Sequence, residues 1–114
     1  VHWLLEAWPL PGAWYALAAP QRLCLCAEYQ LMASPLSGCK TASALPYVQA
    51  ARHAAAQGAD DAVLLHAAGP VAETSRANLF WALPDGRLYT PALATGALPG
   101  VMRGLVLELA AALG

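Results

Sequence analysis

The 114-residue chain has the length of one domain, and its composition is 59% apolar with only 11% charged residues. Its formal net charge of −1 gives no electrostatic footprint for nucleic acid or for an anionic membrane. Its apolar runs are far shorter than the roughly 18 residues that span a bilayer. We therefore expect a soluble, cytoplasmic protein. So few charges suggest that a partner subunit or further chain covers part of the surface, and we expect the sequence to be a fragment.

The opening segment is apolar and aromatic. Residues 2–8 precede a Pro-Leu-Pro-Gly turn and are predicted to form a strand. Trp3, Trp8 and Trp14 lie in or near this segment, and we expect them to pack in the core or at an interface, as large aromatic residues usually do.

The next part of the chain alternates between strands and a helix. Residues 22–30 are predicted to form a strand, and residues 31–38 form a loop that leads to Lys40. The alanine-rich residues 45–57 predict a helix with a proline in its first turn. Gly58 is well placed to end this helix in a left-handed conformation.

The second half is predicted to contain a short strand, a hairpin and a helix. Residues 62–66 form a brief apolar strand. Residues 79–83 and 87–90 flank a Pro-Asp-Gly turn and predict a β-hairpin. Residues 101–113 predict a helix, whose apolar positions recur at helical spacing: Val101, Leu105, Leu109 and Ala112.

The cysteines and histidines indicate no metal site. Cys24, Cys26 and Cys39 are odd in number and lack Cys-x-x-Cys spacing, so neither a disulfide framework nor a zinc site is predicted. Cys24 and Cys26 would share one face of a strand, where we expect buried, reduced thiols. His66 has no second histidine or carboxylate at ligand spacing, so we expect a strand-end residue and not a metal ligand. The same holds for His2 and His53.

Lys40 is the only lysine in the chain, whereas arginine occurs five times. An amine can lose its proton when desolvated and attack a carbonyl to form a Schiff base, which a guanidinium cannot do. The alternative is an ordinary solvent-exposed lysine, and the count of lysines alone does not decide between the two.

Two further features of the sequence suggest a catalytic or ligand-binding site. Glu73 lies in a stretch of apolar and small residues, where a buried carboxylate would need a partner; the alternative is a surface charge between two strands. The Pro99-Gly100 turn opens a predicted helix, and the free N–H groups of a helix N-terminus suit a phosphate, although most such turns bind nothing.

Four blocks in order resemble the class IV aminotransferases, the fold-type IV enzymes that use pyridoxal phosphate. The blocks are residues 40–41, 71–80, 88–91 and 97–103, and the match extends from about residue 23 to residue 114. The resemblance implies an α+β fold, the C-terminal cofactor-binding domain of the D-amino-acid aminotransferase-like fold, with a mixed sheet or barrel flanked by helices. It further implies that residues 1–17 are the tail of a truncated N-terminal α/β domain, and that the cofactor-binding domain of residues 18–114 lacks its C-terminal segment.

The resemblance also assigns roles to individual residues. Lys40 would form the Schiff base with pyridoxal phosphate and later move the proton at the substrate α-carbon. Glu73 would contact the pyridine nitrogen, and Leu98 would lie against the cofactor ring. The phosphate would be bound where the last helix begins, by Gly100, Val101 and Met102. No metal ligand is implied.

Within the family, residues 78–81 and 100–103 are more similar to aminodeoxychorismate lyases, which release pyruvate from 4-amino-4-deoxychorismate and leave 4-aminobenzoate for folate synthesis. Met102 replaces a threonine that is common in the aminotransferases, and Ala44 replaces a larger residue, often tyrosine. A branched-chain or D-amino-acid aminotransferase is the alternative, and a non-catalytic fragment that acts only by assembly is a third. The resemblance implies a small-molecule amino substrate and a homodimer with its site at domain and subunit boundaries.

Overall fold

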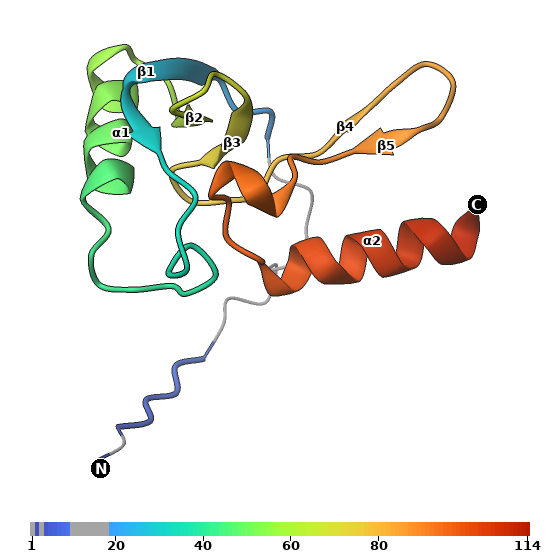
Figure 1. Ribbon diagram of the computed structural model, residues 1–114, viewed down its shortest axis with the longest axis horizontal. Helices are drawn as coiled ribbons and strands as arrows, with labels where there is room; N and C mark the ends of the chain where they lie inside the picture. The colour runs from blue at the N-terminus through green and yellow to red at the C-terminus, as the bar shows by residue number, and fades with distance from the viewer. Residues whose placement is uncertain (1, 3, 10–18) are drawn as a thin grey trace.

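The structure, a computed structural model, describes residues 2, 4–9 and 19–114 and has an α+β architecture (Figure 1). Within these residues the elements follow in this order: β1 (Leu23–Leu31), α1 (Leu45–Ala56), β2 (Asp61–His66), β3 (Val71–Thr74), β4 (Trp81–Ala82), β5 (Leu88–Tyr89), the 3-10 helix η1 (Leu93–Thr95) and α2 (Val101–Leu113). The predicted strand of residues 22–30, the strand of residues 62–66, both long helices and the hairpin are confirmed.

The first three strands form a mixed sheet in the order β1-β2-β3. β1 and β2 are parallel because the chain returns through α1 to the same end of the sheet, whereas the short turn after β2 makes β3 antiparallel to it. Gly69 adopts φ +105° in that turn, a conformation that favours glycine. The mixed sheet confirms the predicted fold class, and the described strands do not close into a barrel.

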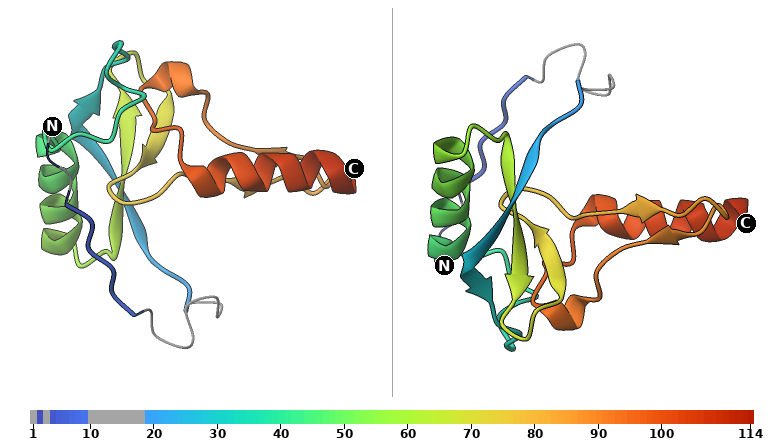
Figure 2. Two further views of the ribbon diagram at one scale, coloured as in Figure 1. Left: turned by 90° about the horizontal axis from the view of Figure 1, so that it is seen from below. Right: turned by 90° about the horizontal axis from the view of Figure 1, so that it is seen from above.

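Helix α1 covers one face of this sheet (Figures 1 and 2). Its contact face consists of small residues, and Ala50 and Ala54 are buried against β1 and β2. Because alanine side chains are short, the helix approaches the strands closely and buries Cys26 and Leu64 completely. The proline lies in the first turn, and Gly58 adopts φ +65°, as predicted.

The three cysteines are free thiols. Cys26 is fully buried, as expected, while Cys24 is only half-buried near the edge of the core. Among the residues that the structure describes, no cluster of histidine, cysteine and carboxylate side chains could hold a metal ion. His66 ends β2 and its Nδ1 accepts a hydrogen bond from the Ala68 amide at 3.0 Å, so it is a strand-end residue as predicted.

The predicted strand of residues 2–8 is wrong for its described residues, which have no regular secondary structure. A strand needs a neighbour to satisfy its backbone groups, and this segment extends away from the sheet in Figure 1. Trp8 was expected to pack in the core or at an interface. It is 78% exposed, so it does not pack in the core of this chain. Trp3, Trp14 and the proposed domain boundary after residue 17 lie outside the described residues.

The β4–β5 hairpin and α2 both project from the sheet on the side opposite α1 (Figures 1 and 2). Trp81 and Tyr89 stack across the hairpin with ring centroids 6.0 Å apart, and Gly86 adopts φ +85° in its turn. No residue of α2 is fully buried, and Val101 is 88% exposed, so the predicted apolar face of this helix is open to solvent in the chain. Neither α2 nor any other described helix is long and apolar enough to cross a membrane.

Candidate active site

One cavity of about 730 Å³ brings together most of the predicted site residues. The loop before α1, the end of β3 and the turn before α2 form its walls. The predicted residues that line it are Lys40, Glu73, Leu98, Gly100 and Val101, and Ala44 lines it too. Met102 is 61% exposed and does not line the cavity. The cofactor roles of all six predicted site residues stay predictions, but five of them share one space.

Strand pairing determines the position of Glu73. In the antiparallel β2–β3 ladder, Glu73 lies opposite Leu64. Paired residues project from the same face of a sheet, so Glu73 lies on the face of the fully buried Leu64, which is part of the core under α1. Glu73 is only 3% exposed. The alternative of a surface charge between two strands is therefore wrong.

Three hydrogen-bond donors surround the Glu73 carboxylate. Its Oε1 accepts a hydrogen bond from the Tyr47 hydroxyl at 2.8 Å and another from the Leu98 backbone N–H at 3.1 Å. Its Oε2 accepts a hydrogen bond from the side-chain amide of Asn78 at 2.9 Å. An ionised carboxylate offers roughly four acceptor positions. Among the described residues no further donor reaches the carboxylate, so one position, on Oε2, is left for a ligand.

The environment of Glu73 favours its neutral form. Burial raises the pKa of Glu73, and this effect outweighs the lowering by the Tyr47 hydroxyl, the Leu98 amide and the positive charge of Lys40. The pKa of Tyr47 is also raised, first by burial and then by its hydrogen bond to Glu73 and the negative charge of that residue. The Tyr47 phenol therefore stays protonated and remains a donor. A cationic group at the open acceptor position would shift Glu73 toward its ionised form.

A second buried carboxylate, Asp61, shows the opposite behaviour. It is 5% exposed at the start of β2. Burial would raise its pKa, but hydrogen bonds from the Ser75 hydroxyl and the Ala62 amide, together with the charge of Arg76, lower the pKa overall. These contacts anchor the chain directly after β3. Asp61 does not line the cavity, so Glu73 is the buried acid available to a ligand there.

Asn78 connects β3 to the turn before α2. Its side-chain nitrogen donates to Glu73 Oε2 and also to the Leu98 carbonyl oxygen at 2.9 Å. A Cβ atom at Gly100 would overlap the Asn78 amide oxygen. Gly100 has φ −60° and ψ 140°, which any residue adopts, so glycine is required there by space and not by backbone conformation.

Helix α2 begins at the edge of the cavity. Gly100 is its N-cap in an extended conformation, with no side-chain hydrogen bond to the cap, and Val101 lines the cavity. The first N–H groups of a helix have no partner within it and lie at the positive end of the helix dipole. This donor set suits an anionic group such as a phosphate.

Lys40 is exposed and follows a tight turn in which the Cys39 amide donates to the Leu36 carbonyl at 2.9 Å. It shares the cavity with Glu73, and its charge acts on that carboxylate. The structure thus places the only lysine of the chain beside its buried, cavity-lining acid. This arrangement could bind a molecule that carries a carbonyl and a basic ring nitrogen.

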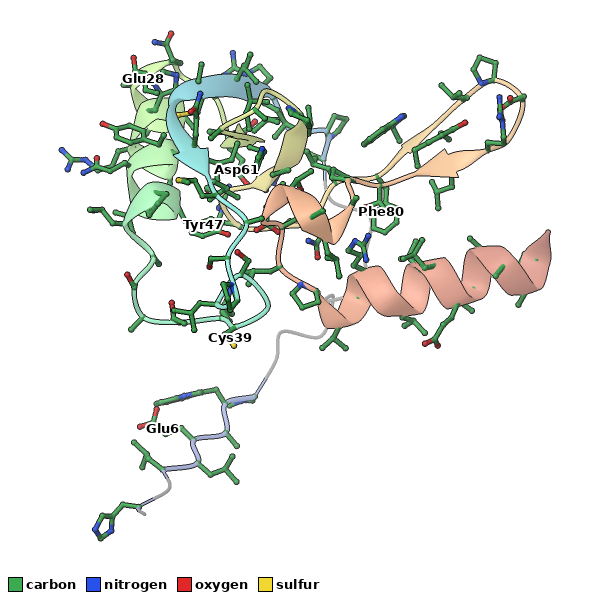
Figure 3. All side chains as sticks on the ribbon, viewed as in Figure 1. Glu6, Glu28, Cys39, Tyr47, Asp61 and Phe80 are labelled. Atoms are coloured by element: carbon green, nitrogen blue, oxygen red, sulfur yellow. The ribbon has the colours of Figure 1, made fainter. Side chains whose placement is uncertain are left out.

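Sequence reasoning did not find the partners of Glu73. Tyr47 belongs to none of the four family blocks, and Asn78 occurs in one of them without a role of its own. One signal could have found Tyr47, because it precedes Ala50 and Ala54 by three and seven positions and so shares their helical face. A large polar residue on a face of alanines indicates a specific buried partner. Figure 3 shows the Tyr47 side chain extending from α1 toward the centre of the molecule.

The chain belongs to the amino-transferase class IV family, whose model matches residues 2–114. Members of this family use pyridoxal phosphate. An aminodeoxychorismate lyase of Vibrio harveyi is 48% identical over 48 residues, which are 42% of this chain and 17% of that protein. The family resemblance drawn from the four sequence blocks is thereby confirmed.

Solved structures of the family share this fold. A Legionella pneumophila protein assigned as a 4-amino-4-deoxychorismate lyase is 35% identical with a TM-score of 0.73, over 82% of this chain and 34% of that chain. The branched-chain aminotransferase of Thermoproteus uzoniensis is 31% identical with a TM-score of 0.71, over 82% of this chain and 32% of that one. The chain thus spans about one third of the length of these structures.

Gly100→Ala tests the steric role of this glycine. We expect the new methyl group to displace the Asn78 side chain and to cost about 1–3 kcal/mol of unfolding free energy, as overpacking and unpaired buried groups do. In an Asn78→Ala background the same change should cost clearly less, because the clashing atoms are gone. Urea unfolding of the four proteins measures this coupling.

Gly104→Ala is the matched control, because a Cβ there has nothing within 4 Å and lies in α2, where alanine is favoured by about 1 kcal/mol. An equal cost of Gly100→Ala with and without the Asn78 side chain would contradict the steric explanation.

Glu73→Gln should change how stability depends on pH in the cofactor-free protein. Because the folded-state pKa of Glu73 is raised above its ordinary value of 4.5, its contribution is complete below that value and is lost as pH rises through the folded pKa. Glutamine does not titrate. The variant should therefore gain stability relative to the wild type as pH rises over this range.

Urea unfolding at a series of pH values measures this difference. Glu108→Gln, which removes one exposed carboxylate from α2, controls for the change in net charge. A difference between Glu73→Gln and wild type that does not change with pH would refute the raised pKa.

Proposed function

We propose that this chain carries the cofactor-binding part of a pyridoxal-phosphate enzyme, with Lys40 and Glu73 as its two main functional residues. The observation that carries the proposal is that the only lysine and a buried carboxylate with one open acceptor position line the same cavity. The start of α2 on the cavity edge adds donors for a phosphate. The residues present therefore fit the chemical groups of pyridoxal phosphate.

Each residue has a task in this proposal. The Lys40 amine would hold the cofactor aldehyde covalently. The Val101 amide at the cavity edge would bind the phosphate, with the Met102 amide next to it in the first turn of α2. Glu73 Oε2 would accept a hydrogen bond from the protonated ring nitrogen, and Leu98 would pack against the ring. When bound, pyridoxal phosphate supplies an electron-withdrawing ring that stabilises negative charge at the substrate α-carbon.

Once its amine is released from the cofactor, Lys40 would also move the proton at that α-carbon, because a free amine beside the reacting atom can act as base and then as acid. Glu73, shielded from water, would keep its charge directed at the ring nitrogen. Burial alone favours the neutral carboxyl, so the ring cation and the carboxylate would stabilise one another. A second copy of the chain would complete the site at the subunit boundary.

For the particular reaction, we propose an aminodeoxychorismate lyase that converts 4-amino-4-deoxychorismate to 4-aminobenzoate and pyruvate. The Vibrio harveyi lyase and the Legionella pneumophila protein support it through 48% and 35% identity. A branched-chain aminotransferase is the second candidate, favoured by the structural likeness to the Thermoproteus uzoniensis enzyme. Both reactions require the same lysine and the same carboxylate.

Covalent capture of the cofactor tests the first level of the proposal. The protein is incubated with pyridoxal phosphate, reduced with borohydride and digested, and we expect the cofactor mass on the peptide that contains Lys40. Lys40→Arg keeps the charge but should abolish the adduct. Arg52→Lys, which adds a lysine on the exposed surface of α1, is the matched control and should gain no adduct at residue 52. Capture at both lysines, or at neither, would contradict a dedicated site.

Product analysis tests the particular reaction. With 4-amino-4-deoxychorismate we expect equal amounts of pyruvate and 4-aminobenzoate, and neither product with Lys40→Arg. With a branched-chain amino acid and 2-oxoglutarate we expect no glutamate. Glutamate formation without pyruvate would replace the lyase by the aminotransferase, and the absence of both reactions would favour a non-catalytic chain.

A further inference from the structure

We propose that Tyr47 is a positioning residue that holds the Glu73 carboxylate in one orientation, with Oε1 fully occupied and Oε2 as the acceptor for a cationic ring nitrogen. The inference rests on the proposed function, since it assigns Tyr47 a task where the cofactor ring would bind. It also concerns a contact within the chain itself, the 2.8 Å hydrogen bond from the Tyr47 hydroxyl to Oε1.

Tyr47 is fixed by its place in the fold. It lies in the first turn of α1, directly after Pro46, whose ring limits the backbone conformations of that turn. Ala50 and Ala54 on the same helical face are buried against the sheet, so α1 cannot rotate without losing these contacts. Glu73 is held by its strand pairing with Leu64. The two ends of the hydrogen bond are therefore carried by packed elements.

The donors divide unequally between the two carboxylate oxygens. Oε1 receives Tyr47 and the Leu98 amide, which together use its roughly two acceptor positions. Of the residues that the structure describes, Asn78 alone donates to Oε2, which keeps one position. Without the Tyr47 hydroxyl each oxygen would have one donor and one free position. The carboxylate would then lose the asymmetry that directs a ligand to Oε2.

Tyr47 also supplies the donor without adding a charge. Among the described residues, the titratable groups that act on Glu73 are Tyr47 on α1 and Lys40 in the preceding loop, while Asn78 and the Leu98 amide do not titrate. If the Lys40 amine is bonded to a cofactor, its positive charge is no longer available to stabilise the Glu73 carboxylate. The phenol, whose own pKa is raised by burial and by Glu73, continues to donate and stabilises the carboxylate against the effect of burial.

A purely structural role is the competing interpretation, in which the Tyr47 ring only fills space between α1 and β3. Tyr47→Phe separates the two, because it keeps the ring and removes the hydroxyl. A packing role predicts that this variant behaves like the wild type. A positioning role predicts changes at Glu73 and in the bound cofactor.

The first measurement uses the cofactor-free protein with carbon-13 in its glutamate carboxyl groups. The pH titration of Glu73, assigned through Glu73→Gln, should move to higher pH in Tyr47→Phe, because a hydrogen bond that lowers its pKa is lost. Tyr29→Phe makes the same chemical change on β1, outside the cavity of Lys40 and Glu73, and should leave the Glu73 titration in place. An unchanged titration in Tyr47→Phe would overturn the inference.

The second measurement uses the full protein with pyridoxal phosphate bound. Borohydride capture at Lys40 should persist in Tyr47→Phe, while the affinity for the cofactor falls about tenfold, as the loss of one hydrogen bond to a charged group implies. The visible absorption of the bound cofactor changes with pH, and the midpoint of this change on the acid side should move to higher pH by about one unit. Capture with wild-type affinity and an unmoved midpoint would refute the positioning role and leave the proposed function intact. A wild type without capture would refute the proposed function itself.

A second variant covers the case in which Tyr47→Phe fails to fold. Replacement of Tyr47 by 3-fluorotyrosine keeps the hydroxyl and makes it a stronger donor, so the Glu73 titration should move to lower pH. A shift in this direction, opposite to that of Tyr47→Phe, supports the inference. A titration that does not respond to the fluorine would refute it.

Discussion

The burial of Glu73 is the constraint on which the rest of the site depends. An isolated charge in a protein interior costs several kcal/mol, so a carboxylate that is 3% exposed must have partners. Here the partners come from α1, from the chain after β3 and from the turn before α2. These three segments are far apart in the sequence, and one side chain requires them to meet. The geometry of the cavity follows from satisfying that carboxylate.

The residues around Glu73 differ in how strongly packing and hydrogen bonds hold them in place. Tyr47 is carried by a helix that packs its alanines on the sheet, and Asn78 follows a segment anchored by Asp61. Lys40 instead lies in an exposed loop that contributes little to the core. A rigid acid opposite a more exposed amine suits a site that holds a ring on one side and allows the amine to exchange partners on the other.

The projecting elements have a different character. Helix α2 has no fully buried residue, and the β4–β5 hairpin extends beside it on the same side of the sheet (Figure 2). Large apolar side chains stay exposed there, which matches a composition with few charges. The expectation that further chain or a second subunit covers this surface stays a prediction. The chain spans about one third of the structures that it resembles.

Local patterns in the chain are enough to predict most of its elements and its family. Helical spacing, turn residues and four ordered blocks predicted α1, α2, the hairpin, β1 and β2, because these signals lie within a few neighbouring residues. The sequence alone could not determine that β3 is a strand that buries Glu73, or that residues 2–8 are not a strand. Both depend on how the strands pair and which face the sheet buries, and neither is set by the residues of the segment alone. Tyr47 became a partner of Glu73 only when α1 packed on the sheet. A contact across 26 positions is decided by tertiary packing, since no local pattern carries it.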